Sequence, residues 1–126
     1  MRAVDTQVLV RLIARDDSAQ LKAAEAFVSP GAWVSQIVLV ETVWVLETVL
    51  ALDAERLAQA VDMLLNHQNL SVQDAEIAAD ALRHYRQRPS LGFSDCLVLE
   101  CARKAGHLPL GTFDRDLARI AGGQRL

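Results

Sequence analysis

Residues 2–14 have the sequence RAVDTQVLVRLIA, and the pattern of this stretch recurs along the chain. Arg2–Asp5 contains the apolar pair Ala3-Val4 and ends in a polar residue, which indicates a short buried strand. Thr6–Ala14 has apolar residues at helical spacing and is therefore expected to form a helix. The residue at the junction of these two elements is an aspartate, Asp5.

Short apolar runs and amphipathic stretches alternate through the rest of the sequence. Further strands are expected at 33–35, 70–72, 108–111 and 124–126. Further helices are expected from a cap at Ser18 to about Val28, at 37–52, from Asp53 onward, from Asp74 to about Arg88, at 93–105 and at 115–121. Short strands that alternate with helices favour a parallel sheet. We therefore predict one α/β domain over residues 1–126, with a short, mostly parallel sheet of about four to five strands flanked by helices.

The helix expected at 37–52 is apolar on nearly every face, which is typical of a central buried helix. Trp33 and Trp44 are accordingly expected in the core. The composition agrees with a folded domain, because 52% of the 126 residues are hydrophobic, which excludes a disordered tail or linker protein. The two cysteines, Cys96 and Cys101, are too few for a disulfide-dense secreted scaffold.

No stretch of the sequence has the pattern of a membrane span or a signal peptide, because the longest apolar run, Ile37–Val40, ends at Glu41. These features favour a soluble cytoplasmic protein. The net charge is −3, but residues 1–80 hold 5 basic and 12 acidic residues, whereas residues 81–126 hold 8 basic and 4 acidic residues. Arginine accounts for 11 of the 13 basic residues and suits bidentate contact with phosphate, although a solvated helical face explains part of this basic segment.

Four carboxylates stand out by their positions. Asp5 and Asp114 follow expected strands, and α/β sheets bind ligands outside the carboxyl ends of their strands. Asp95 is expected in the first turn of a helix capped by Ser94, where the helix dipole favours a negative charge. Glu41 lies among large apolar residues with no basic residue close in sequence, and an unpaired buried carboxylate is costly.

Each of these acids also has a purely structural explanation. Asp5, Asp95 and Asp114 fit helix N-termini, with Thr112 as the cap beside Asp114, and Glu41 fits the edge of a helix that reaches water. Together, however, several carboxylates at one edge of a small sheet repel one another unless a cation neutralises them. Oxygen ligands select hard cations, which implies Mg²⁺ or Mn²⁺ and metal-assisted hydrolysis of a phosphodiester.

In their order along the chain, these residues resemble the PIN domain and, within it, the VapC-type toxins of bacterial toxin–antitoxin pairs. The resemblance rests on VDTQVLVR at 4–11, VE at 40–41, GFSDCL at 92–97 and TFD at 112–114, and it covers essentially the whole chain. It implies a PIN-like three-layer fold and a Mg²⁺- or Mn²⁺-dependent endoribonuclease that is the toxin of such a pair. Gln7 stands where the family usually has Asn, which predicts an altered orientation of Asp5 without loss of activity.

The resemblance also implies roles for individual residues. The catalytic and metal-binding acids would be Asp5, Glu41, Asp95 and Asp114, with Asp116 as a further candidate ligand. The hydroxyls expected to orient carboxylates are those of Thr6, Ser94 and Thr112. The arginines expected to contact RNA phosphates or the antitoxin are Arg11 and Arg115. The implied partners are RNA, a small antitoxin whose C-terminal segment covers the site, and a second copy of the chain in a homodimer.

Two other functions compete with this interpretation. A catalytically weak or inactive PIN-like module that acts through an antitoxin would tolerate loss of one or more acids, whereas all four are present. A DNA flap nuclease usually carries longer arches and additional acids, which this short chain lacks. The histidines His67, His84 and His107 have no metal-ligand spacing and are expected at the surface or in capping roles.

Overall fold

The computed structural model describes residues 1–126, which divide into two units, Met1–Ala75 and Glu76–Leu126. The elements of the first unit are β1 (Arg2–Ala3), α1 (Thr6–Ala14), α2 (Ser18–Val28), β2 (Ala32–Val34), α3 (Gln36–Thr48), α4 (Ala54–Asn66) and β3 (Leu70–Val72). From the boundary onward, the elements are α5 (Ala75–Gln87), η1 (Pro89–Leu91), α6 (Phe93–Ala105), β4 (Leu110–Thr112), η2 (Leu117–Arg119) and β5 (Gly123–Arg125). This mixture of helices and parallel strands confirms the predicted α/β class.

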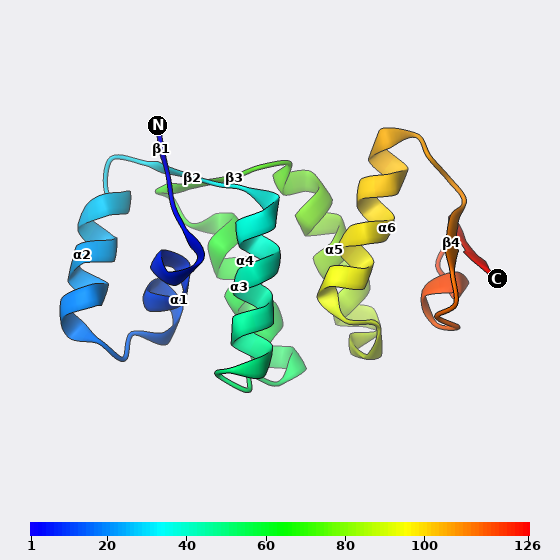
Figure 1. Ribbon diagram of the computed structural model, residues 1–126, viewed down its shortest axis with the longest axis horizontal. Coiled ribbons are helices and arrows are strands. Elements are labelled where there is room, and N and C mark those ends of the chain that lie inside the picture. The colour runs from blue at the N-terminus through cyan, green and yellow to red at the C-terminus, as the bar shows by residue number, and fades with distance from the viewer. The chain divides into compact units, whose positions relative to one another are not determined.

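The first unit contains a parallel sheet in the order β1–β2–β3, in which Ala32 pairs with Arg2 on one side and Leu70 on the other. Figure 1 shows these three strands along one end of helices α1 to α4. The fully buried side chains in the core of this unit include Leu9, Val34, Leu39, Leu46, Leu57 and Leu64. Burial of these large apolar side chains is the main term that stabilises the unit.

Polar side chains directly before the first helical residue set the starts of several helices. The side chains of Asp17, Ser35 and Asp53 accept hydrogen bonds from backbone N–H groups in the first turns of α2, α3 and α4. The predicted helices at 6–14 and 93–105 are confirmed to the residue, and the helix expected after Ser18 is α2. Its cap is Asp17 rather than Ser18, because the Asp17 side chain accepts the hydrogen bond from the Gln20 N–H and Ser18 is already the first helical residue. Helix α6 ends at Gly106, whose φ of 82° lies in the left-handed region that favours glycine.

The end of α3 differs from the prediction. The helix ends at Thr48 rather than at Leu52, because Ala51 adopts a left-handed conformation with a φ of 53°. The Leu52 N–H then donates to the carbonyl oxygen of Leu46 at 3.0 Å, which closes the helix in the manner usually associated with a glycine. Since no glycine or proline marks this position, the sequence carries no clear stop signal there.

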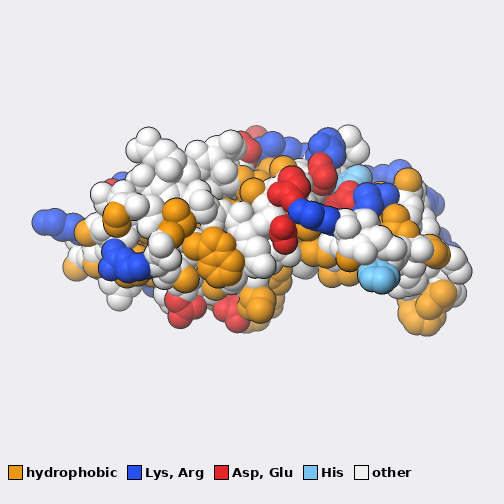
Figure 2. All heavy atoms as spheres, turned by 90° about the horizontal axis from the view of Figure 1, so that it is seen from above, with side chains coloured by type: hydrophobic (Ala, Val, Ile, Leu, Met, Phe, Trp, Pro, Cys, Tyr) orange, Lys and Arg blue, Asp and Glu red, His pale blue; other side chains and the backbone are white.

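The prediction that α3 is buried on all sides is wrong. Leu39 and Val43 face the core, where α3 contacts α1 and α4, but Ile37 is 74% and Trp44 63% exposed, because no element of this unit covers that face. Trp33, also expected in the core, is 39% exposed. Figure 2 likewise shows hydrophobic side chains that reach the surface between charged ones.

In the second unit, Tyr85 of α5 and Phe93 of α6 meet edge to face, with ring centroids 6.3 Å apart and an interplanar angle of 89°. Such aromatic pairs add about 0.5–1.5 kcal/mol beyond the burial of their area. Strands β4 and β5 form a parallel pair in which Leu110 lies opposite Gly123. None of the helices in the chain has the length and apolar character needed to cross a membrane.

The parallel strands form a three-stranded sheet in the first unit and a two-stranded sheet in the second. Two details of the C-terminal prediction need correction. The helix expected at 115–121 is the short 3₁₀ turn η2, because Asp114 caps only a single turn. Ser94 is not the cap of α6: the helix begins at Phe93, with Gly92 before it.

Candidate active site

In the first unit, Asp5, Thr6 and Glu41 form one hydrogen-bonded group. Strand pairing reaches Val4, whose N–H donates to the carbonyl oxygen of Trp33 at 3.0 Å, so Asp5 directly follows the sheet. The Thr6 N–H donates to Asp5 Oδ1 at 2.7 Å, and the Thr6 hydroxyl donates to Glu41 Oε2 at 2.8 Å. Because Thr6 is buried, its hydroxyl fixes the orientation of the Glu41 carboxylate.

Asp5 and Glu41 also line the same cavity, which has a volume of about 590 Å³ and includes Gln7 and Trp44 in its wall. Each of the two carboxylates uses one oxygen in a hydrogen bond within the protein and leaves the other oxygen open to a ligand. Glu41 is exposed, so of the two alternatives that the sequence left open, the structure agrees with a glutamate at the edge of a helix that reaches water. The reason is that Glu41 lies near the exposed face of α3 that carries Trp44.

In the second unit, Asp95 and Asp114 interact electrostatically. Asp95 is the third residue of α6, and its side chain carries the acidic charge of the first turn. Partial burial of the carboxyl group raises the pKa of Asp95, and the negative charge of Asp114 raises it further. Two carboxylates in this relation are more stable when a cation or a proton lies between them.

Asp114 is held by the turn that follows β4. Its Oδ1 accepts from the backbone N–H groups of Asp116 at 2.8 Å and Leu117 at 3.0 Å. The Thr112 hydroxyl accepts from the Asp114 N–H at 3.0 Å, so it orients the backbone of Asp114 rather than its carboxylate. The carboxylate of Asp116 lies 3.9 Å from the Arg119 guanidinium. Ser94 is exposed in the first turn of α6.

The donor chemistry of both pairs fits a hard divalent cation. All four side chains offer carboxylate oxygens, and oxygen ligands are those that Mg²⁺ and Mn²⁺ prefer. The pair Asp5 and Glu41 shares a cavity, and the pair Asp95 and Asp114 has the mutual repulsion that a cation relieves. No group of three or more His, Cys, Asp or Glu side chains forms a ready metal site in the structure.

The two arginines expected to contact RNA or the antitoxin have different surroundings. The Arg11 guanidinium donates to Asp16 Oδ1 at 2.8 Å, and its side chain is only 27% exposed. Its Nε is buried without a hydrogen-bond partner. Arg115 is exposed in the turn between Asp114 and Asp116. Since Asp16 already compensates the charge of Arg11, Arg115 is the better placed of the two to contact an external anion.

The second unit contains a buried polar cluster that was not predicted from the sequence. Glu100 of α6 is 6% exposed and accepts from Arg103 Nε at 2.7 Å and shares a hydrogen bond of 2.8 Å with His84 Nε2. Burial raises the pKa of Glu100, but the hydrogen bonds and charges of Arg103 and His84 outweigh it, so the pKa is lowered. The spacing of Glu100 and Arg103 could have indicated their pairing. His84 lies on another helix, and no local pattern connects it with Glu100.

The protein has a small α/β fold with pairs of carboxylates that lie after a strand and at the start of a helix. Domains of this class are suited to divalent cations and phosphate chemistry. The PIN domain family matches residues 2–123, and the chain belongs to this family. PIN domains are generally nuclease domains and generally use a divalent metal. No curated protein and no solved structure matches the chain.

Proposed function

We propose that this protein is a metal-dependent endoribonuclease, the VapC-type toxin of a toxin–antitoxin pair, that acts in the cytoplasm. The observation that carries this proposal is the match to the PIN domain over residues 2–123 in a chain that retains all four acids of the expected site. Two observations support the proposal: the electrostatic repulsion between the carboxylates of Asp95 and Asp114, which a cation would relieve, and the cavity that Asp5 and Glu41 share.

In this proposal, Asp5, Glu41, Asp95 and Asp114 are the ligands of Mg²⁺ or Mn²⁺, and Asp116 is an additional ligand candidate. When bound, the cation polarises the scissile phosphate and provides a nucleophile at neutral pH. Thr6 holds Glu41 in one orientation through its hydroxyl, and the backbone of the η2 turn holds Asp114 through Oδ1. Arg115, beside Asp114, offers a guanidinium to an RNA phosphate.

The proposal includes an antitoxin and a second copy of the chain as partners. The exposed side chains of Ile37 and Trp44, seven residues apart and therefore on the same face of α3, support this part. Large apolar side chains grouped on one exposed face are typical of protein interaction surfaces. Trp44 also lines the cavity of Asp5 and Glu41, so a partner that covers this face would be close to the proposed ligands.

Cleavage of total cellular RNA by the purified protein tests the proposal. Reactions with Mg²⁺, with Mn²⁺ and with a chelator are compared for the wild type, Asp95→Asn and Glu55→Gln. Asp95→Asn removes one charge at constant shape, and Glu55→Gln removes one charge from an exposed position in α4. We expect discrete products that require the metal, disappear with Asp95→Asn and persist with Glu55→Gln.

The second candidate function is an inactive PIN-like module that acts through its antitoxin partner. Retention of all four acids argues against it, since a module without catalysis has no need of them. A folded wild type that cleaves no RNA and binds no Mn²⁺ in a titration would favour this module. Cleavage that persists in the chelator would contradict the metal-dependent mechanism.

A further inference from the structure

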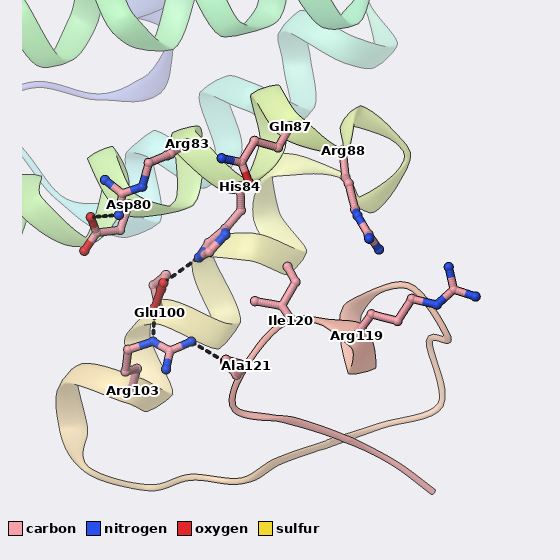
Figure 3. Close-up of a pocket in the computed structure, with 10 residues that line it drawn as sticks. All are labelled: Asp80, Arg83, His84, Gln87, Arg88, Glu100, Arg103, Arg119, Ile120 and Ala121. Atoms are coloured by element: carbon pink, nitrogen blue, oxygen red, sulfur yellow. Dashed lines mark hydrogen bonds and ion pairs between the residues drawn. The ribbon is translucent and has the colours of Figure 1, made fainter.

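The second unit contains an arginine-rich cavity of about 480 Å³, lined by residues of α5, α6 and the η2 segment (Figure 3). We call it the arginine pocket, after the four guanidinium groups in its wall: Arg83, Arg88, Arg103 and Arg119. Two acids, Asp80 and Glu100, also line it. None of the carboxylates proposed as metal ligands belongs to it, so its chemistry needs a separate explanation.

The two acids in the wall are already engaged by two of the arginines. Asp80 Oδ1 accepts from Arg83 at 2.6 Å, and Glu100 accepts from Arg103 at 2.7 Å. Arg88 has no acidic partner in the structure. The nearest acid to Arg119 is Asp116, at 3.9 Å, which lies outside the pocket wall. The pocket therefore carries two positive charges in excess of its own acids.

Hydrogen bonds fix the segments that carry these two arginines. The Arg88 N–H donates to the carbonyl oxygen of His84 at 2.9 Å, at the end of α5. Arg103 donates to the carbonyl oxygen of Ala121 as well as to Glu100, which ties the chain just after Arg119 to α6. In Figure 3 the Arg88 side chain extends from the link between α5 and η1 toward the η2 segment, where Arg119 lies.

A phosphate group matches this arrangement. Its oxygens accept hydrogen bonds from guanidinium groups in a planar, bidentate geometry, and its negative charge offsets the excess positive charge of the pocket. Both arginines are exposed, so an extended strand can reach them. We propose that the arginine pocket binds a backbone phosphate of a single-stranded RNA through Arg88 and Arg119, apart from the proposed metal ligands. This inference rests on the proposed ribonuclease function.

The test compares Arg88→Gln, Arg119→Gln and the double variant with Arg125→Gln as a matched control. Arg125 is exposed in the same unit, lies outside the pocket, and loses the same charge on substitution. Binding of a fluorescent single-stranded RNA is measured by anisotropy across a salt series, in EDTA and without phosphate buffer. The logarithm of the RNA association constant falls linearly with the logarithm of the salt concentration. Loss of one phosphate contact makes this negative slope shallower by about 0.7, which weakens binding about fivefold at 0.1 M salt.

We expect the fivefold loss of RNA affinity in the double variant. Each single variant should show nearly the whole loss, because both side chains hold one phosphate. Arg125→Gln should change the affinity less. A second arm titrates inorganic phosphate and follows the Nε–H signals of Arg88 and Arg119 by NMR. Shifts with phosphate but an unchanged RNA slope in the double variant would indicate a free-phosphate site and overturn the proposal.

The proposed function and this inference fail in different ways. A wild type that cleaves RNA, together with a double variant whose RNA binding equals that of Arg125→Gln, would overturn the arginine pocket alone. A wild type that neither binds nor cleaves RNA would overturn the proposed function and this use of the pocket with it. Thermal unfolding of every variant separates a lost contact from a lost fold.

Discussion

Replacement of Glu100 by glutamine tests whether its buried carboxylate holds the second unit together. Glu100 is 6% exposed and takes hydrogen bonds from Arg103 and His84, so E100Q leaves a neutral amide beside two donors. Removal of one member of a buried ion pair costs about 3–5 kcal/mol. Because glutamine keeps the shape and one acceptor oxygen, and because Arg103 is 38% exposed, we expect a loss of about 2 kcal/mol.

Urea denaturation followed by circular dichroism at pH 7 measures this loss, with Glu55→Gln as the control for one removed surface charge. We expect a lower free energy of unfolding for E100Q and a melting temperature lower by about 8 °C, whereas the control stays within about 0.5 kcal/mol of the wild type. A double-mutant cycle with Arg103→Gln should give a coupling energy of about 1–2 kcal/mol. Equal stabilities of E100Q and Glu55→Gln would refute the reasoning.

The difference in stability between the wild type and E100Q should depend on pH. The pKa of Glu100 lies below its ordinary value of 4.5, because the hydrogen bonds from Arg103 and His84 outweigh burial, which acts in the opposite direction. A lowered pKa in the folded state means that the carboxylate stabilises the fold fully above the ordinary pKa. That contribution is lost as the pH falls below about 4.5 through the folded pKa, so the gap between wild type and E100Q should narrow there.

Three further predictions concern single side chains. Thr6→Val removes the hydroxyl that orients Glu41, and we expect the rate of RNA cleavage to fall about 10- to 100-fold, measured by single-turnover kinetics. Burial raises the pKa of the Cys96 thiol to about 11, so Cys96 should react with a thiol reagent at pH 8 only when urea unfolds the protein, as mass spectrometry of labelled peptides can check. Gly106→Ala places a side chain at a φ of 82° in open space, so backbone strain alone should lower the free energy of unfolding by about 1 kcal/mol in urea titrations.

The sequence predicted most accurately those elements whose ends carry a chemical signal. α6 ends at Gly106, and this helix was predicted to the residue, whereas the cap of α2 is Asp17 and not the Ser18 that the sequence pattern indicated. α3 lacks such a signal at its end, and its stop depends on Ala51 in a conformation that alanine rarely adopts. Local capping therefore explains both the successes and the error.

Burial on α3 could not be predicted for a different reason. An all-apolar helix is consistent with a helix buried on every side and also with one that leaves a face for a partner. Trp44 is 63% exposed, and only the three-dimensional packing of α1 and α4 against α3 reveals which face of the helix remains open. The hydrogen bond between Glu100 and His84 could not be predicted either, because the two residues lie on separate helices that only the three-dimensional packing brings together.

Asp5 shows that a side chain that caps a helix can keep one oxygen free for a ligand. Asp5 caps α1 through Oδ1, which leaves Oδ2 for a cation. Asparagine caps a helix as well as aspartate but carries no charge, whereas alanine does neither. Asp5→Asn should therefore unfold within about 0.5 kcal/mol of the wild type, Asp5→Ala should lose about 1 kcal/mol, and both should lose metal-dependent RNA cleavage. Full cleavage by Asp5→Asn would mean that Asp5 only caps the helix, and equal destabilisation of both variants would mean that its charge, rather than its hydrogen bond, supports the fold.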